Sequence, residues 1–219
     1  MPLPAFTVVK THKTLTLYGW GIIFFISAVV FIGAIFTTHP FLSASHPTNG
    51  QALVVNGWLS DLDLQEAFDI FNKSDHYQIL IVSGGTIHSG AFLSRYKSYA
   101  ELGYASLKAM GFNTEKLFFA PALEVTKDRT YAEALAVKKK LAQIPFTIDK
   151  IDLFTEGVHT RRSWYLYQLA LGDKYQVGAL SATIHHYDSD RWWAYSAGVR
   201  QTMNEAIAYI YARFFFKPE

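Results

Sequence analysis

Apolar and polar positions along the chain predict two parts of different kinds. From Leu17 to Phe36 there is no charged residue, and a helix of about 20 such residues is long enough to cross a bilayer. After a short polar stretch with two prolines, the pattern changes to brief apolar runs separated by amphipathic segments. The pattern therefore predicts a transmembrane helix at 17–36, a linker at 37–50 and a folded domain at 51–215.

The folded part divides into five strand–helix units. The predicted strands are 51–57, 77–85, 116–122, 150–157 and 175–182, and the helices that follow them are 59–73, 98–111, 129–143, 159–172 and 191–215. Strands that are apolar throughout, rather than alternating, are typical of a parallel sheet covered on both faces. We therefore expect an open, three-layer α/β domain of Rossmann-like type with a mostly parallel sheet.

The lysines predict how the first helix is oriented. Lys10 and Lys13 precede it, and no lysine or arginine follows until Lys73; positive residues favour the cytoplasmic side. We expect residues 1–16 in the cytoplasm, a single pass through the inner (cytoplasmic) membrane, and the domain on the periplasmic or extracytoplasmic side. The alternative is a signal peptide cleaved near residues 43–45, although the apolar region of a signal peptide is usually shorter.

Composition and missing motifs exclude several functions. The chain has no cysteine, which excludes thiol catalysis, cysteine-ligated metals and disulfides. Its net charge of +2, without a long basic run, argues against a nucleic-acid partner. The absence of G-x-G-x-x-G, P-loop and G-x-S-x-G motifs leaves a nicotinamide cofactor, NTP hydrolysis and serine hydrolysis without support. The sequence indicates neither a particular cofactor nor a protein partner.

Polar residues gather where the predicted strands end, and in an open parallel sheet ligands bind beyond those ends. The candidates for ligand binding in these loops are Asn56, Gly57, Ser83, Gly84, Gly85, Arg129, Thr130, Thr155 and Arg162. The fourth loop also places His159 at a predicted helix start, where free backbone N–H groups favour an anion and cations do not help the helix. We expect His159 and Arg162 to act on one bound anion, with Arg162 as its charge clamp.

Some of these features have structural alternatives. Ser83-Gly84-Gly85 would also suit a turn that ends a strand. Ser98 with Glu101, and Thr130 with Glu133, have the spacing of a capping box. The segment "HHYDSD" at 185–190 suggests a metal site, but adjacent histidines on a loop seldom converge on one ion, so we expect no metal.

Several segments together form a pattern: Ser83-Gly84-Gly85, "SYAEL" around Glu101, "KDRTYAEA" with Thr130 and Glu133, "TEGVHTRRS" with Thr155, His159 and Arg162, and an aromatic last helix with Arg200 and Glu205. This pattern resembles the ElyC/SanA/YdcF-like family, built around domain of unknown function 218. The chain departs from the family pattern at Arg129, Glu156 and Thr160. The resemblance implies a role in cell-envelope or cell-wall homeostasis, and it adds Glu101 and Glu133 to the candidate site.

Two functions of different classes stay open. In the first, the domain is an enzyme acting on a phosphorylated or nucleotide-like metabolite: Arg162 and the amides of residues 83–85 hold the anion, and His159, oriented by Glu101, is the catalytic acid or base. In the second, the domain is an anchored module that binds or senses such a ligand without chemistry.

Overall fold

The computed structural model describes residues 12 and 14–218, which form two compact units, one up to Thr37 and one from Thr38 onward. Lys10, Lys13 and most of the predicted cytoplasmic segment 1–16 lie outside the described residues. Most of the first unit is helix α1 (Leu17–Leu42), which is apolar on all sides. Among the described residues, α1 is the one helix whose length and composition suit a membrane span.

The second unit is built on a five-stranded sheet. Its strands are β1 (Ala52–Asn56), β2 (Ile79–Gly84), β3 (Leu117–Pro121), β4 (Lys150–Glu156) and β5 (Gln176–Ala182). They lie in the order β3-β2-β1-β4-β5, and every neighbouring pair is parallel. The predicted parallel sheet is confirmed. Because the chain order reverses between β1 and β4, a crevice for ligands is expected at the carboxyl ends of these strands.

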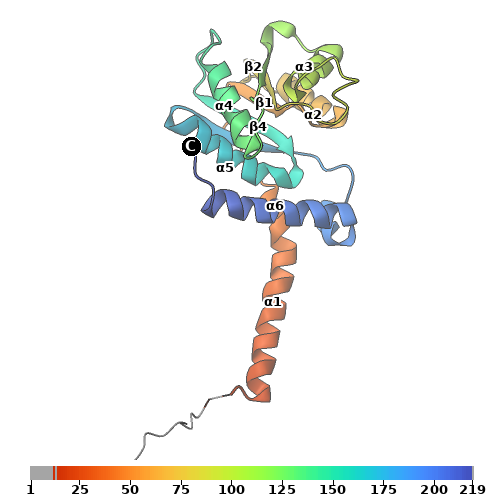
Figure 1. The fold of residues 1–219 in the computed structure, drawn as a ribbon, viewed down its shortest axis with the longest axis vertical. Helices are drawn as coiled ribbons and strands as arrows, with labels where there is room; N and C mark the ends of the chain where they lie inside the picture. Colours follow the sequence, from red (N-terminus) through yellow and green to blue (C-terminus); the bar gives the residue numbers. More distant parts are fainter. Residues whose placement is uncertain (1–11, 13, 219) are drawn as a thin grey trace, which may run out of the picture. The chain divides into compact units, whose positions relative to one another are not determined.

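Helices cover both faces of the sheet, as predicted. Helices α2 (Asp61–Lys73) and α3 (Tyr99–Ala109) lie on one face, and α4 (Arg129–Leu141) and α5 (Thr160–Leu171) lie on the other (Figure 1). A hydrophobic core lies on each face of the sheet, and successive strand residues point into opposite cores. Val54 packs on the side of α4 and α5, and Leu53 packs on the side of α2 and α3. Both side chains are fully buried. The expected three layers are therefore present.

Short 3-10 helices and one more α-helix complete the unit. The 3-10 turns are η1 (Thr114–Lys116), η2 (Gly157–His159), η3 (Gly172–Lys174) and η4 (Ser189–Ala194). Helix α6 (Ser196–Phe214) packs beside α5. The predicted last helix, 191–215, is therefore interrupted: the dihedral angles at Arg191, inside η4, are non-helical, and the extended backbone at Tyr195 separates η4 from α6.

The helix starts follow the local sequence signals. Ser60 caps α2 in a capping box with Asp63, and Ser98 caps α3 in a capping box with Glu101. Each serine accepts a hydrogen bond from the backbone of the acidic residue, whose side chain accepts one in return, so two otherwise unpaired N–H groups are satisfied at each start.

The predicted linker is partly helical. Helix α1 ends at Leu42 rather than at Phe36, and Pro40 lies within its last turn. His39 and Leu42 are buried, with 4% and 1% of their surfaces exposed, and His39 Nε2 lies 3.1 Å from the Tyr187 hydroxyl. The last turn of α1 is therefore stabilised by tertiary packing in the α/β unit, because a sequence with two threonines and a proline would not favour a helix by itself.

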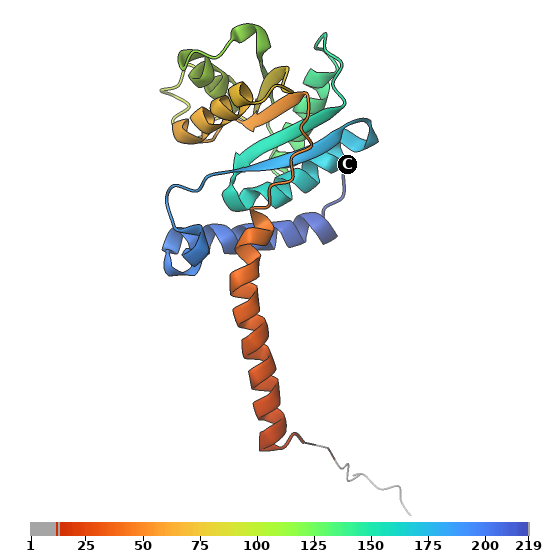
Figure 2. The same cartoon turned by 180° about the vertical axis from the view of Figure 1, so that it is seen from behind.

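The rest of the linker is fixed to the sheet. His46 exchanges backbone hydrogen bonds with Ala179 of β5. Asp152, in the middle of β4 and fully buried, accepts from the backbone N–H and the hydroxyl of Thr48, from the Gly50 N–H at 3.0 Å and from the Tyr77 hydroxyl at 2.9 Å. Figure 2 shows this segment crossing β5 and β4 before it enters β1. Asp152 therefore acts as a structural clamp.

Candidate functional site

A cavity of about 560 Å³ lies beyond the carboxyl ends of the strands. Its walls are the loops that follow β1, β2 and β3, the first turns of α4 and α5, and the C-terminal half of α6. Six of the residues singled out in the sequence line it: Gly85, Arg129, Thr130, Glu133, His159 and Arg162. The fold therefore brings the second, third and fourth strand–helix junctions together, as an open parallel sheet should.

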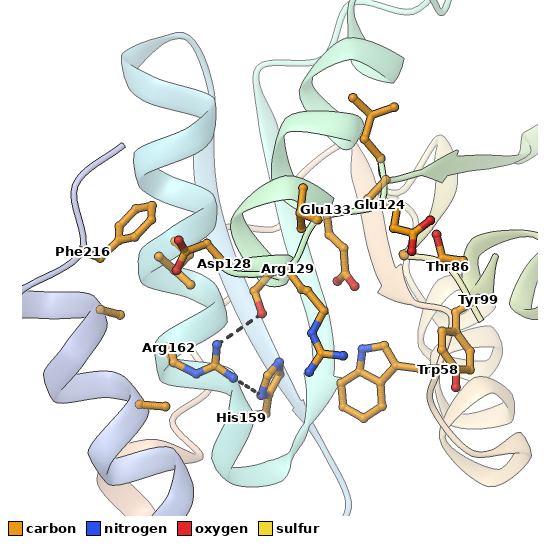
Figure 3. A pocket seen from close by; sticks show the side chains of 18 of the residues that line it. Trp58, Thr86, Tyr99, Glu124, Asp128, Arg129, Glu133, His159, Arg162 and Phe216 are labelled. Atoms are coloured by element: carbon orange, nitrogen blue, oxygen red, sulfur yellow. Dashed lines mark hydrogen bonds between the residues drawn. The ribbon is translucent and has the colours of Figure 1, made fainter. Parts of the chain in front are cut away.

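Arg162 and His159 lie together in the wall of the cavity (Figure 3), and both pair with Glu205 of α6, which completes a charged cluster. Arg162 donates from Nε to Glu205 Oε2 at 2.8 Å and from Nη2 to Glu205 Oε1 at 3.1 Å. Its Nη1 donates to the Thr130 hydroxyl at 3.2 Å. This two-pronged ion pair holds the guanidinium firmly. The donors expected to clamp an anion are thus already engaged by α6 and Thr130.

His159 is oriented by the same carboxylate. Its Nδ1 lies 3.0 Å from Glu205 Oε1 and 3.0 Å from Arg162 Nη2. A protonated Nδ1 donates to Glu205, whereas a bare Nδ1 accepts from Arg162, so the cluster accommodates either tautomer. The imidazole also packs edge-on against Trp58, with ring centroids 5.4 Å apart. A carboxylate on Nδ1 leaves Nε2 available for proton transfer.

The Glu205 carboxylate stays ionised because of its two partners. Burial acts to raise its pKa, but the hydrogen bonds and charges of His159 and Arg162 outweigh burial and lower the pKa to about 2. Glu205 therefore serves as a permanent negative charge that fixes both neighbours.

A second carboxylate, Glu133, lies deeper in the site and belongs to a buried polar network. Asn56 Nδ2 donates to Glu133 Oε2 at 3.1 Å and to Ser83 Oγ at 3.2 Å. Ser83 Oγ is in turn 3.0 Å from the Tyr167 hydroxyl, which is fully buried. Asn56 Oδ1 is buried without a hydrogen-bond partner among the described residues. The network ties the ends of β1 and β2 to α4 and α5.

The environment of Glu133 tunes its protonation. Burial raises the pKa of this carboxyl to about 7, although the Gly85 backbone N–H and the charges of Arg129 and Arg162 act in the opposite direction. Burial also raises the pKa of Tyr167, which keeps that hydroxyl protonated. A carboxyl with a pKa near neutrality in a cavity can accept or donate a proton at working pH.

Arg129 is the cation that remains available for a ligand. No hydrogen bond or ion pair joins its guanidinium to any residue in the described part of the chain. Figure 3 shows it reaching between Glu133 and Trp58 toward His159. The residue before it, Asp128, has a left-handed backbone (φ 56°), and its side chain does not cap α4. The start of α4 therefore has no side-chain cap, and an anion could take that place.

Other predicted residues have different places. Glu101 does not line the cavity; its carboxylate accepts from the Lys97 and Ser98 backbone N–H groups, so its expected role in orienting His159 is wrong and Glu205 has that role. A Cβ on Gly57 would lie 2.1 Å from the Tyr99 carbonyl oxygen, and one on Gly84 would lie 2.7 Å from the Ala100 nitrogen. These two glycines allow α3 to pack closely on the strand ends.

Three further candidates stand behind the cavity wall or take another role. Asn56 and Ser83 are buried in the Glu133 network, and Thr155 is fully buried with its hydroxyl unpaired among the described residues. Thr130 and Glu133 do not form the alternative capping box, because α4 begins after Asp128 and Thr130 accepts from Arg162.

Residues that could ligate a metal converge elsewhere. Asp63, Glu66 and His185 place one potential ligand atom each within 4.8 Å of the others. However, both Glu66 oxygens accept from Thr183 at 3.0 Å, and Asp63 is the capping partner of Ser60. The alternative metal site at 185–190 is not assembled among the described residues, since His186 faces Gln201 and Asp188 pairs with Arg191.

Sequence reasoning missed three important site residues. The sequence pattern includes Glu205 only as part of the last helix, and neither Trp58 nor Tyr167 is among the candidate site residues, because an aromatic residue beside or on a helix gives no signal of its own. The resemblance at Glu205 was the one available clue, because the residue is 46 positions from His159. No protein-family model matches the chain, and no curated protein matches it.

Proposed function

We propose that the α/β unit is an enzyme that binds a phosphorylated or nucleotide-like metabolite in this cavity and transfers protons to or from it. The observation that carries the proposal is Glu133, a buried carboxyl with a pKa of about 7 beside the unpaired Arg129. Tuned carboxyls of this kind cluster at catalytic sites.

Anion binding is assigned to the start of α4. Arg129 supplies a planar guanidinium that matches a phosphate group, and the first turn of α4, which has no side-chain cap, lies beside it in the chain. Trp58 and Tyr99, which also line the cavity, offer flat apolar surfaces to a base or a similar ring. This combination favours a ligand with both a phosphate and a planar part.

Proton transfer is assigned to Glu133 and His159. Near neutral pH Glu133 exists in both protonation states, so it can act as acid or as base. His159, oriented through Nδ1 by Glu205, provides the complementary group with Nε2. Two groups of different chemistry in one cavity are what acid–base catalysis needs.

We further propose that α1 anchors the protein in the inner membrane with the α/β unit on the extracytoplasmic side. The length of α1 and the lysine asymmetry of the sequence support this topology. The resemblance to the ElyC/SanA/YdcF-like family supports a role in cell-envelope or cell-wall homeostasis.

One observation favours the alternative of a non-catalytic binding module. Arg162, His159 and Glu205 satisfy one another without a ligand, as residues of a purely structural cluster do. In that alternative Arg129 and α4 still bind the anion, and Glu133 sets only the pH at which binding occurs.

Binding and turnover separate the two functions. Full-length protein in detergent is titrated calorimetrically with pyrophosphate and with adenosine 5′-monophosphate, and turnover is followed with p-nitrophenyl phosphate. Arg129→Gln should weaken binding at least about tenfold, the scale of a lost charge-assisted hydrogen bond. Lys139→Gln, at the far end of the same helix, is the matched control and should bind as the wild type does.

The behaviour of the Glu133→Gln variant decides whether the protein is an enzyme or a non-catalytic binding module. Turnover abolished with binding retained supports the enzyme, whereas binding without turnover by the wild type supports the module. Equal binding by wild type and Arg129→Gln contradicts the proposed site altogether. Mass spectrometry of small molecules that co-purify with the protein then identifies the natural ligand.

A further inference from the structure

Helix α6 has an exposed apolar stripe along its whole length. The stripe consists of Val199, Met203, Ile207, Ile210 and Phe214, whose exposed fractions run from 39% at Val199 to 74% at Phe214. Spacings of three and four residues place all five side chains on one face of a helix. Scattered apolar residues on a surface are ordinary, but a continuous stripe marks a surface that contacts something apolar.

The opposite face of α6 is already used by the domain. Glu205 points from it to Arg162, Ala208 and Ala212 line the cavity, and Ala212 is buried. The stripe is therefore not needed to hold α6 in place. Among the described residues the stripe is an exposed second face on a helix whose first face contributes to the candidate site.

The chain next to the apolar part of α1 contacts α6 directly. Phe41 packs against Tyr209, with ring centroids 5.4 Å apart. Arg161 of α5 donates to the Phe41 carbonyl oxygen, and its guanidinium lies 4.2 Å from the Phe41 ring. Phe41 follows closely after Phe36, where the predicted transmembrane segment ends. The C-terminal end of α1 is thus tied to the side of α6.

The flanks of the stripe carry cations. Helical periodicity places Arg200 on one side of it and Arg213 on the other, and both side chains are exposed. Tyr211 and Phe215 add exposed aromatic surface near the C-terminal end. Apolar and aromatic residues bordered by arginines are the pattern of a helix that lies in the plane of a membrane interface.

We propose that the stripe of α6 rests in the headgroup region of the bilayer that α1 enters, so that α6 is an interfacial helix. The occupant of the stripe is a phospholipid surface, because the contact of Phe41 with Tyr209 brings this helix to the exit point of the anchor. The inference rests on the proposed membrane anchoring by α1 and is independent of the ligand chemistry of the cavity.

The absence of cysteine makes a clean labelling experiment possible. Three single-cysteine variants of the full-length protein, Ile207→Cys, Leu62→Cys and Phe25→Cys, are labelled with nitrobenzoxadiazole and reconstituted into vesicles of phosphatidylcholine and phosphatidylglycerol. Quenching by lipids with a nitroxide on the acyl chain is then measured. Leu62 of α2 is the matched control, since it is 63% exposed and Ile207 is 64% exposed.

We expect the labels at positions 207 and 25 to be quenched several-fold more than the label at 62. If position 25 is quenched but 207 behaves like 62, the anchor stands and the interfacial helix is wrong. If neither 25 nor 207 is quenched, the membrane anchoring fails as well. Disulfide cross-linking of unlabelled Ile207→Cys between copies, without lipid quenching, would assign the stripe to a second copy of the chain and overturn the proposal.

Discussion

The raised pKa of Glu133 makes the stability of the α/β unit depend on pH in a calculable way. The folded carboxyl has a pKa of about 7 and an ordinary one of 4.5. Between these values the folded state binds more protons than the unfolded state, so the free energy of unfolding falls as pH rises. Each unit of pKa difference changes the free energy of unfolding by about 1.4 kcal/mol, so the shift of Glu133 lowers it by roughly 3 kcal/mol over this pH interval.

Glu133→Gln isolates this contribution, because glutamine cannot ionise. Relative to this variant, the wild type should lose roughly 3 kcal/mol of stability between pH 4.5 and 7 and no more above pH 7. Denaturant unfolding in detergent measures the difference through tryptophan fluorescence, to which Trp58, Trp164, Trp192 and Trp193 of the α/β unit contribute.

Glu124→Gln is the control, since Glu124 lines the same cavity but its side chain is exposed. Its stability difference from the wild type should stay small at every pH. A difference between wild type and Glu133→Gln that is flat from pH 4.5 to 8, or that grows with pH, would refute the assignment of a proton to this buried carboxyl.

Two further predictions concern the ion pair and the topology. Glu205→Gln should destabilise the protein by about 2–3 kcal/mol at pH 7, because it leaves Arg162 without its counter-charge. The extra stability of the wild type over Glu205→Gln should be lost as pH falls from 4.5 toward the Glu205 pKa of about 2. A stability difference that acid does not change would contradict the stabilising ion pair. An alkaline phosphatase reporter fused after residue 219 should be active, whereas activity from a cytoplasmic reporter alone, or a mature N-terminus near residue 45, would contradict the proposed anchor.

Local patterns were sufficient to predict the fold. Runs such as Ile79–Val82 are apolar on both faces because helices cover both sides of the sheet, and Ser60 and Ser98 mark helix starts through contacts three residues away. Signals of this range are contained in the sequence itself. The last turn of α1 was missed because its support, the burial of Leu42 against the α/β unit, is not local.

The site was predicted less completely, for a related reason. Strand-end loops were expected to converge, and Arg129, Glu133 and His159 do line one cavity. Their chemistry, however, depends on partners distant in the chain. Arg162 is expected from the sequence to clamp a bound anion, yet in the structure it pairs with Glu205, 43 positions away in the chain. No spacing rule predicts which residue of the last helix faces the fourth loop.

The Asp152 clamp has a consequence for the order in which the domain assembles during synthesis. The neighbours β1, β2 and β3 are made first and can pair as soon as they emerge. Residues 46–50, however, find their partners in Asp152 of β4 and Ala179 of β5. They must wait until about one hundred more residues have been made, because Thr48 lies 104 positions before Asp152 and Gly50 lies 102 positions before it. The residues that follow α1 can thus take their final positions only after β4 and β5 have been made, although they are among the first of the domain to be made.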